Sequence, residues 1–403
     1  MLRTLRKAEY AELTLLFFIQ GVAMSTWFVP LGSILDAHGM HGIKPFAFAA
    51  TALAAFVSPL IFGAVADRHV APARVLRWLA VATAAMMTLV STAIKFHANA
   101  WLVLALIQLL TLCNAPMLSI SSTIIFARLA HSNEFAPMRV MLTFGWMAGG
   151  VLASVLNADT SSLASYTSAT VWLVLAAFTF LLPELEVPKA AENLSWHERL
   201  GLDALTLLKN PDTRVVFVTT MLLNIPLAAF YPNAPTNLRD LGLTHTSAWM
   251  SLAQVSEVAA ICSLGWLLVH WRMKWIFAFG LGFGVLRFAL SAVNTKTCLL
   301  IGIGLHGASY ALVYITAQIY LEQRVATAWR ARAQALLTLM NSGVGNLIGY
   351  LGTGWWFTAC ARPAGTQWTV FWGGLSVVVV VVLGYFLTAF RGQKMSDLRS
   401  RES

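Results

Sequence analysis

The stretch SLAQVSEVAAICSLGWLL, residues 251–268, places an amide and an acid, Gln254 and Glu257, three positions apart in an otherwise apolar run. Residues at this spacing share one face of a helix. An ionised carboxylate at bilayer depth is costly, so it usually faces a cavity or a partner. Desolvation favours the neutral form of a carboxylate, which makes proton uptake and release near neutral pH feasible. We therefore predict that Glu257 couples protons; the alternative is a hydrogen bond to a neighbouring helix.

Other polar and aromatic residues recur at helical spacing inside apolar runs. Arg139, Thr143 and Trp146 stand at i, i+4 and i+7, so one face carries a cation, a hydroxyl and an indole. Such a face suits a polar ligand that contains a ring. Similar stripes are His306, Tyr310, Tyr314 and Gln318; Gln20, Met24 and Trp27; and Asn224 with Tyr231. We expect Gln20, Tyr231 and Tyr310 to contact a ligand, although any single ring can serve packing alone.

The elements that must hold these residues are long apolar runs. Of the 403 residues, 58% are hydrophobic and 11% charged, which is more apolar surface than one soluble core can bury. A helix needs about 20 apolar residues to cross a bilayer. The sequence predicts an all-α polytopic membrane protein with twelve transmembrane helices. The expected spans are 10–36, 44–66, 72–95, 98–128, 138–158, 163–183, 213–236, 246–270, 273–293, 297–322, 330–358 and 367–390.

The basic residues are distributed unequally between the two sides of the membrane. The termini and the even-to-odd loops hold 21 of the 27 Lys and Arg residues, the opposite loops hold five, and Arg287 lies within a span. The positive-inside rule then predicts that both termini are cytoplasmic. We attribute the formal charge of +10 to this topology and to contact with membrane lipids. The basic residues are dispersed along the chain and form no nucleic-acid-binding stripe.

The sequence lacks the motifs of several kinds of chemistry. The four cysteines, Cys113, Cys262, Cys298 and Cys360, are scattered, without metal-ligand spacing. Motifs of nucleotide hydrolysis and of familiar hydrolases are absent. We therefore expect no metal, no cofactor and no enzymatic activity, so the energy for any transport must come from elsewhere.

The longest polar interval, residues 184–212, divides the chain into two sets of six predicted spans. Its leucines and a tryptophan predict an amphipathic helix on the cytoplasmic face. We expect an N-terminal bundle (1–183), this connector (184–212), a C-terminal bundle (213–391) and a cytoplasmic tail (392–403). Two bundles that rock around a midplane site are typical of secondary transporters.

A short charged stretch recurs in outline in the two halves. GAVADRHVAPAR, residues 63–74, resembles the G-x-x-x-D-R-x-x-x-[RK] motif of the major facilitator superfamily, with the last basic residue displaced to Arg74. Gly63 would permit close helix contact, and Asp67 could exchange partners between Arg68 and Arg74 during conformational gating. The counterpart GWLLVHWRMK, residues 265–274, keeps a glycine and Arg272 but has no acid. An ordinary charged loop is the alternative for both stretches.

A more specific resemblance joins motifs along most of the chain. They are R-x-x-x-T-x-G-[FW] from Arg139, GLDALTLLKN (201–210), Q-x-S-E from Gln254, LRFAL (286–290), G-A-x-[FY] from Gly307 and R-A-x-A-Q from Arg330. In this order they resemble the nucleoside:proton symporter family of the major facilitator superfamily. The resemblance implies the fold of that superfamily, two six-helix bundles, and proton-driven import of nucleosides across a bacterial cytoplasmic (inner) membrane.

The resemblance also implies site residues, and the chain departs from it at three positions. Arg139, Thr143, Trp146, Gln254 and Glu257 match residues of the family's substrate cavity, and Tyr310 occupies an aromatic position. Where nucleoside-binding members carry Gln and Asn on the seventh span, this chain has Ala228 and Tyr231; where they carry Asp on the tenth, it has Ala311. Each lost hydrogen bond would leave a ligand group unpaired, at roughly 1–3 kcal/mol. A modified nucleoside, a nucleobase or a glycoside is therefore an open alternative.

Three functional classes follow from these observations. We expect a proton-coupled symporter of nucleosides or nucleoside-like solutes, acting as a monomer. The alternatives are a carrier or exporter of another solute, such as a sugar, glycoside, lipid or cell-wall fragment, and a membrane enzyme or transporter-like sensor. Ion dependence of uptake and a substrate panel discriminate among them.

Overall fold

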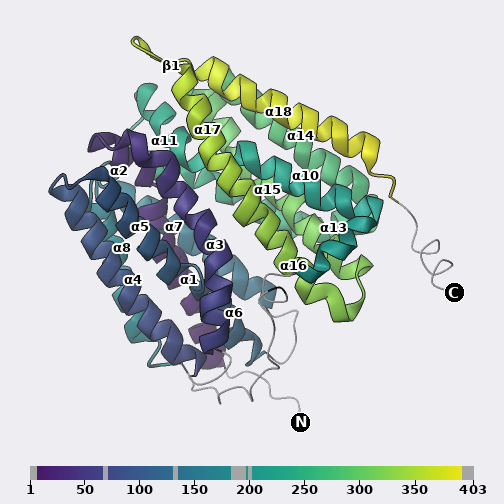
Figure 1. Cartoon of the computed structure of the whole chain (residues 1–403), viewed down its shortest axis with the longest axis horizontal. Helices are drawn as coiled ribbons and strands as arrows, with labels where there is room; N and C mark the ends of the chain where they lie inside the picture. Colours follow the sequence, from purple (N-terminus) through teal and green to yellow (C-terminus); the bar gives the residue numbers. More distant parts are fainter. Residues whose placement is uncertain (1–6, 67–70, 130–134, 183–196, 198–201, 393–403) are drawn as a thin grey trace. The chain divides into compact units, whose positions relative to one another are not determined.

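The computed structural model describes residues 7–66, 71–129, 135–182, 197 and 202–392 (Figure 1). Regular structure in these ranges is helical except for one short antiparallel hairpin, β1 (Ala361–Arg362) and β2 (Gly365–Thr366). Nine helical stretches within them are long and apolar enough to cross a membrane, and two shorter apolar helices accompany them. The predicted all-α membrane class is thereby confirmed, while the count of twelve spans stays a prediction.

The helices of the first half follow the predicted runs closely. They are α1 (Lys7–Phe28), α2 (Leu31–Ala37), the short 3-10 helix η1 (His41–Ile43), α3 (Lys44–Ala66), α4 (Pro72–Lys95), α5 (Ala100–Asn114), α6 (Met117–Phe126), α7 (Phe135–Val155) and α8 (Leu163–Phe178). The boundaries of α3 and α4 agree with the predicted 44–66 and 72–95.

The second half begins with the 3-10 helix η3 (Leu202–Lys209), which lies at the end of the predicted connector. The remaining helices are α10 (Pro211–Leu227), α11 (Phe230–Asp240), α12 (Thr246–Met250), α13 (Leu252–His270), α14 (Met273–Ala292), α15 (Lys296–Arg324), η4 (Thr327–Trp329), α16 (Arg330–Thr338), the π-helical segment η5 (Leu339–Gly345), α17 (Asn346–Cys360) and α18 (Trp368–Ala389). Most of the connector lies outside the described residues, so its predicted amphipathic helix stays a prediction.

Four predicted spans are interrupted rather than continuous, which the sequence interpretation missed, and a fifth contains a π-helical segment. Pro30 separates α1 from α2 and Pro116 separates α5 from α6. Pro226 lies in the last turn of α10, just before the break that leads to α11. Proline supplies no amide hydrogen and crowds the preceding turn, so it explains the first two breaks. The third break follows Pro226, because the Ala228 amide still donates to the Asn224 carbonyl in the helical pattern. The span at 246–270 breaks at Ser251, and that at 330–358 contains η5.

The chain forms two compact units whose borders cut through two predicted spans. The first unit comprises Met1–Asn193 with Tyr231–Gln254, and the second comprises Leu194–Phe230 with Val255–Ser403. The helices α11 and α12 therefore belong with the helices of the first half. The chain crosses from one unit to the other immediately after the break between α10 and α11.

Close backbone contact holds the first unit together around α1 and α7. These helices pack along their length, and α4 packs on α8. A Cβ atom at Gly145 would overlap the carbonyl oxygen of Phe18, and one at Gly21 would overlap that of Leu142. Glycine is therefore required at both positions, because only glycine lets the two backbones approach so closely.

The second unit is built on α14 and its neighbours. This helix packs against α15 and α18, while α10, drawn in teal, packs against the yellow-green α17 and yellow α18 (Figure 1). Gly280 lies against Leu312 and Val313 of α15. Many large apolar side chains of both units stay exposed, among them Trp78, Leu109, Val269, Trp355 and Val381. Exposed apolar side chains on long apolar helices are expected of a surface solvated by lipid.

Candidate functional site

Three aromatic rings from separate elements meet in the first unit. Phe28 ends α1, Trp146 lies in α7 and Tyr231 is the second residue of α11. Their ring centroids lie 5.9 Å apart for Phe28 and Trp146, 5.3 Å for Phe28 and Tyr231, and 5.9 Å for Trp146 and Tyr231, all edge to face. The structure thus brings the predicted residues Trp146 and Tyr231 together. Phe28 was not predicted, although its position one residue after Trp27 could have indicated an aromatic surface.

Two predicted amide side chains lie in the same unit, and one of them contacts this cluster. The Gln254 side-chain nitrogen donates to the Tyr231 hydroxyl at 3.3 Å, which adds a third predicted residue to this group. Gln20 of α1 is 0% exposed, and neither its oxygen nor its nitrogen has a hydrogen-bond partner among the described residues. The Trp146 indole nitrogen is also buried without a partner there. Buried polar groups without partners are rare, and they call for a ligand or ordered water.

The other two predicted residues of α7 have different surroundings. Thr143 is buried, one turn before Trp146. The Arg139 guanidinium lies 5.9 Å from the ring centroid of Phe17, and Phe17 in turn contacts Phe135 edge to face. An arginine over an aromatic face is held by a cation–π interaction. The three predicted residues therefore lie along α7, with Arg139 at one end and the Trp146 indole in the aromatic cluster.

In the second unit, the helix that carries Glu257 packs directly against α15. The backbone amide of Ala308 donates to the Ser256 hydroxyl at 3.0 Å. Glu257 is half-buried beside this contact. One turn further, Ala260 and Leu264 form an apolar cluster with Ala311. The absence of a carboxylate at position 311 is thus matched by apolar packing, and Glu257 is the acid of α13 beside this contact.

A small cavity marks the aromatic face of α15. It has a volume of about 10 Å³ and is lined by Thr220, Leu223, Asn224, Leu227, Tyr310, Val313 and Tyr314. The rings of Tyr310 and Tyr314 are stacked with centroids 5.1 Å apart and planes 13° apart. The predicted residue Tyr310 therefore lies in a polar and aromatic wall that Asn224 of α10 shares.

A buried cation lies next to the break in the seventh predicted span. Arg287 of α14 is 2% exposed and donates to Nδ1 of His306 in α15. The His306 ring stacks on Phe230 with centroids 3.8 Å apart, and the guanidinium lies 4.9 Å from the Phe230 ring centroid. Since His306 accepts a hydrogen bond from a cation, its ring is neutral here. His306 thus packs on Phe230 and bonds to Arg287.

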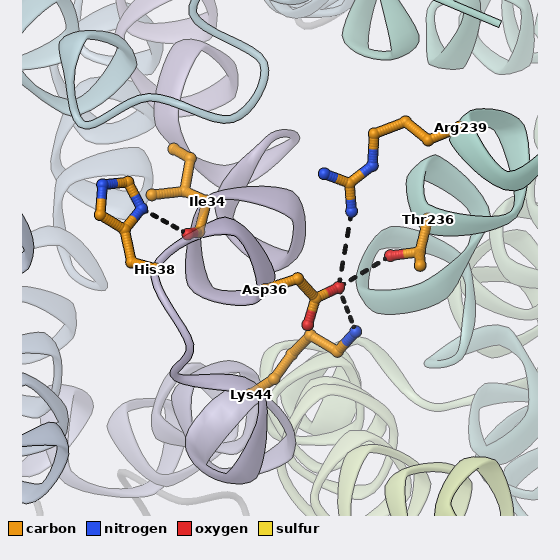
Figure 2. Close-up of polar contacts among 6 residues, drawn as sticks. All are labelled: Ile34, Asp36, His38, Lys44, Thr236 and Arg239. Carbon is orange, nitrogen blue, oxygen red and sulfur yellow. Dashed lines mark hydrogen bonds and ion pairs between the residues drawn. The ribbon is translucent and has the colours of Figure 1, made fainter. Parts of the chain in front are cut away.

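An ionic cluster in the first unit was not predicted. Asp36 of α2 accepts hydrogen bonds from Lys44 at 2.8 Å and from Thr236 of α11 at 2.9 Å, and Arg239 lies 3.7 Å from the same oxygen (Figure 2). The side chains of Lys44 and Asp36 are 4% and 17% exposed. The cluster joins residues 200 positions apart, so no local sequence signal could have revealed it.

A second carboxylate holds the next segment of the same unit. Asp159 accepts hydrogen bonds from the Ser247 backbone amide at 2.7 Å, from Ser154 at 3.0 Å and from Thr246 at 3.4 Å. Ser154 also accepts from the Ala248 amide at 2.9 Å. Asp36 and Asp159 therefore tie α11 and α12 to the helices of the first half.

The predicted gating motif is described only in part. Gly63 lies near the end of α3, whereas Asp67 and Arg68 lie outside the described residues. The proposed exchange of ion pairs at Asp67 stays a prediction. The ranges described contain no group of three or more His, Cys, Asp and Glu side chains that could hold a metal ion.

The fold defines the class of protein. The structure matches a crystal structure of the POT family transporter PepTSo with a TM-score of 0.72 and 12% identity, over 97% of this chain and 100% of that chain. Identity at this level shows the fold alone. The chain has the fold of the major facilitator superfamily of secondary transporters, as the sequence predicts.

The sequence comparisons narrow this class to one family. The nucleoside H+ symporter family matches residues 8–395, so the chain belongs to it. YegT of Escherichia coli (strain K12) is 30% identical over 94% of this chain and 93% of its own. A crystal structure of a variant of the nucleoside transporter NupG matches with a TM-score of 0.87 and 25% identity, over 95% of this chain and 100% of that chain. The resemblance seen in the motifs is confirmed.

Proposed function

We propose that this protein imports nucleosides or nucleoside-like solutes together with protons by alternating access. Family membership supports the class of substrate and the coupling ion. The site residues are our own assignment. Within the first unit they are Gln20, Arg139, Thr143, Trp146, Tyr231 and Gln254, and within the second they are Glu257 and Tyr310.

The observation that carries this assignment is the pairing of aromatic surface with unpartnered polar groups. A nucleoside presents a flat base and several hydrogen-bonding groups. The rings of Phe28, Trp146 and Tyr231 offer apolar walls, and the buried Gln20 amide and Trp146 indole offer hydrogen-bonding atoms with no partner in the described part of the chain. Binding sites combine apolar walls with a few placed polar groups in this way.

Glu257 is the proposed proton carrier. Ala311 cannot titrate and packs in an apolar cluster, and Arg287 and His306 bond to each other next to Phe230. We therefore assign proton exchange to the Glu257 carboxylate. Protonation would remove the charge of Glu257 and let the loaded transporter change conformation without burying an ion. Deprotonation on the cytoplasmic side would reset the cycle.

Rocking of the predicted bundles, 1–183 against 213–391, would separate α11 and α12 from the helices of the first half. Asp36 and Asp159 accept hydrogen bonds from α11 and α12. The predicted topology places both carboxylates on the outer side of the inner membrane, opposite the cytoplasmic termini. The two clusters therefore act as an outer latch that opens and closes in each cycle.

A binding panel tests the substrate class. Purified protein is heated with nucleosides, nucleobases, sugars and muropeptides, and the melting temperature is recorded. A ligand at 100 times its Kd stabilises a protein by about 2.7 kcal/mol. We expect stabilisation by at least one nucleoside, reduced in Trp146→Ala. Stabilisation by sugars or muropeptides alone would favour the alternative carrier function.

A further inference from the structure

The turn between α13 and α14 contains the second charged stretch that the sequence singles out. This stretch, residues 265–274, contains Arg272 but no acidic residue. Across the described ranges no acidic side chain forms an ion pair with Arg272. Arg272 is exposed immediately before the first residue of α14. A guanidinium therefore stands at the boundary where a predicted span begins.

The same turn forms the rim of a pocket. The pocket has a volume of about 620 Å³ and is lined by His270, Trp271, Arg272, Trp275, Ala278 and Phe279, all within the second unit. This volume is within the range of about 300–1,000 Å³ that is common for small-molecule sites. Trp271 meets Phe279 edge to face at 5.7 Å, so rings line the pocket along the first turns of α14.

Neighbouring polar groups are already engaged, which fixes the shape of the turn. The Lys274 ammonium donates to the backbone oxygens of Leu387 at 2.9 Å and Phe390 at 2.7 Å, at the end of α18. His270 Nδ1 lies 2.9 Å from the Trp266 carbonyl oxygen, and its ring stacks on the Trp266 ring at 4.4 Å. Because a carbonyl only accepts, Nδ1 is the donor and Nε2 remains available. Arg272 supplies the positive charge of the rim.

We propose that this pocket binds the headgroup of an anionic phospholipid of the cytoplasmic leaflet. The Arg272 guanidinium presents paired donors that match a phosphate. Trp271 and Trp275 are amphipathic rings of the kind that lie at headgroup level. Phe279, one turn into the span from Trp275, extends the apolar wall toward the depth of the acyl chains. The proposal rests on the predicted topology, in which this turn is cytoplasmic, and is independent of the transported solute.

Charge and depth together favour a lipid over other occupants. Arg272 precedes a span of 20 residues, so its side chain stands where headgroups lie. The cytoplasmic leaflet carries anionic lipids that attract basic residues next to a span. The exposed Trp266 and Val269 flank the turn with apolar surface that a soluble anion would leave uncovered.

Native mass spectrometry of the full chain tests the proposal. The protein is released from detergent with phosphatidylglycerol or phosphatidylcholine, and the bound fraction is measured against lipid concentration. We expect tighter binding of phosphatidylglycerol, and about fivefold weaker binding of it in Arg272→Gln, the effect of one basic residue near an anionic surface. Trp275→Leu, which keeps an apolar side chain, should weaken binding of both lipids.

Lys296→Gln is the matched control, because Lys296 is exposed beyond the other end of α14 and the net charge changes equally. We expect it to bind phosphatidylglycerol as the parent does. If Arg272→Gln and Lys296→Gln weaken phosphatidylglycerol binding equally, the proposal is wrong, because binding then depends on the net charge of the protein. Equal binding of the two lipids by the parent, or displacement of phosphatidylglycerol by millimolar inorganic phosphate, would also overturn it. Substrate stabilisation measured in parallel keeps this outcome separate from that of the proposed function.

Discussion

Replacing Asp36 with asparagine should loosen α11. The carboxylate oxygen Oδ2 accepts from Lys44 and Thr236 and faces Arg239, and the Lys44 side chain is only 4% exposed (Figure 2). Asparagine keeps the size and one acceptor oxygen but removes the charge that both cations meet. The variant therefore isolates the electrostatic part of the cluster.

The expected size of the effect follows from burial. Removing one partner of a fully buried ion pair costs about 3–5 kcal/mol. Asp36 retains 17% exposure and asparagine still accepts one hydrogen bond, so we expect a smaller loss of about 2 kcal/mol, within the range for hydrogen bonds to charged groups. A change of 2 kcal/mol corresponds to roughly a thirtyfold change in an equilibrium constant.

Alkylation of a buried cysteine reports the opening of α11. Ala234 lies in α11 and is 1% exposed, so Ala234→Cys in a background without the four native cysteines places a small reporter there. When opening is fast and reversible, the labelling rate follows the open population. We expect Asp36→Asn to accelerate labelling by roughly thirtyfold, in line with the estimate of 2 kcal/mol.

The control is an ion pair of similar chemistry but greater exposure. Glu322 pairs with Arg330 at 2.9 Å, and its side chain is 55% exposed. Exposed pairs contribute about 0–1 kcal/mol, so Glu322→Gln should leave the labelling rate unchanged. If Asp36→Asn accelerates labelling less than about threefold, the cluster does not hold α11 and the latch interpretation fails.

Three further predictions concern packing and binding. Trp146→Ala should weaken nucleoside binding by about 1–3 kcal/mol in a titration, as loss of base stacking does; unchanged affinity for every transported solute would contradict stacking. Gly145→Ala should lower the thermal stability, because the added Cβ would overlap the Phe18 carbonyl oxygen. Gly282→Ala is the control: a Cβ there meets nothing within 4 Å, so this variant should raise the stability by up to about 1 kcal/mol. Equal effects of the two variants on the melting temperature would refute the close contact at Gly145. Arg287→Met should lower the melting temperature more than Arg272→Gln, since it leaves His306 without its donor; equal melting temperatures would contradict a structural role for the buried pair.

Periodicity predicted the helices and part of the site from the sequence. Long apolar runs located α3, α4 and α14 almost to the residue, because a span must satisfy its backbone within one helix. The spacing of Thr143 and Trp146 placed both on α7, and Tyr310 and Tyr314 stack as their spacing predicts. These features depend on neighbours in the sequence.

Features that join distant residues could not be predicted in the same way. The pairing of Asp36 with Thr236 depends on the tertiary fold, as does the contact of Phe28 with Tyr231. The prediction also ran the first span continuously through Pro30, where missing hydrogen bonds end α1. His306 shares a stripe with Tyr310, yet its contacts are with Arg287 and Phe230. Periodicity predicts which residues share one face of a helix, but it does not predict which residues that face contacts in the folded protein.

Proton-driven accumulation by Glu257 is the central claim, and a single uptake experiment tests it. Parent protein and Glu257→Gln are reconstituted into liposomes, and uptake of a labelled nucleoside is measured with and without an imposed pH gradient, alongside exchange between equal pools. Glutamine preserves size and hydrogen bonding but cannot titrate. We predict that the parent concentrates the nucleoside only when the gradient is imposed, and that Glu257→Gln exchanges it without concentrating it. Accumulation by Glu257→Gln in response to the gradient would contradict the claim.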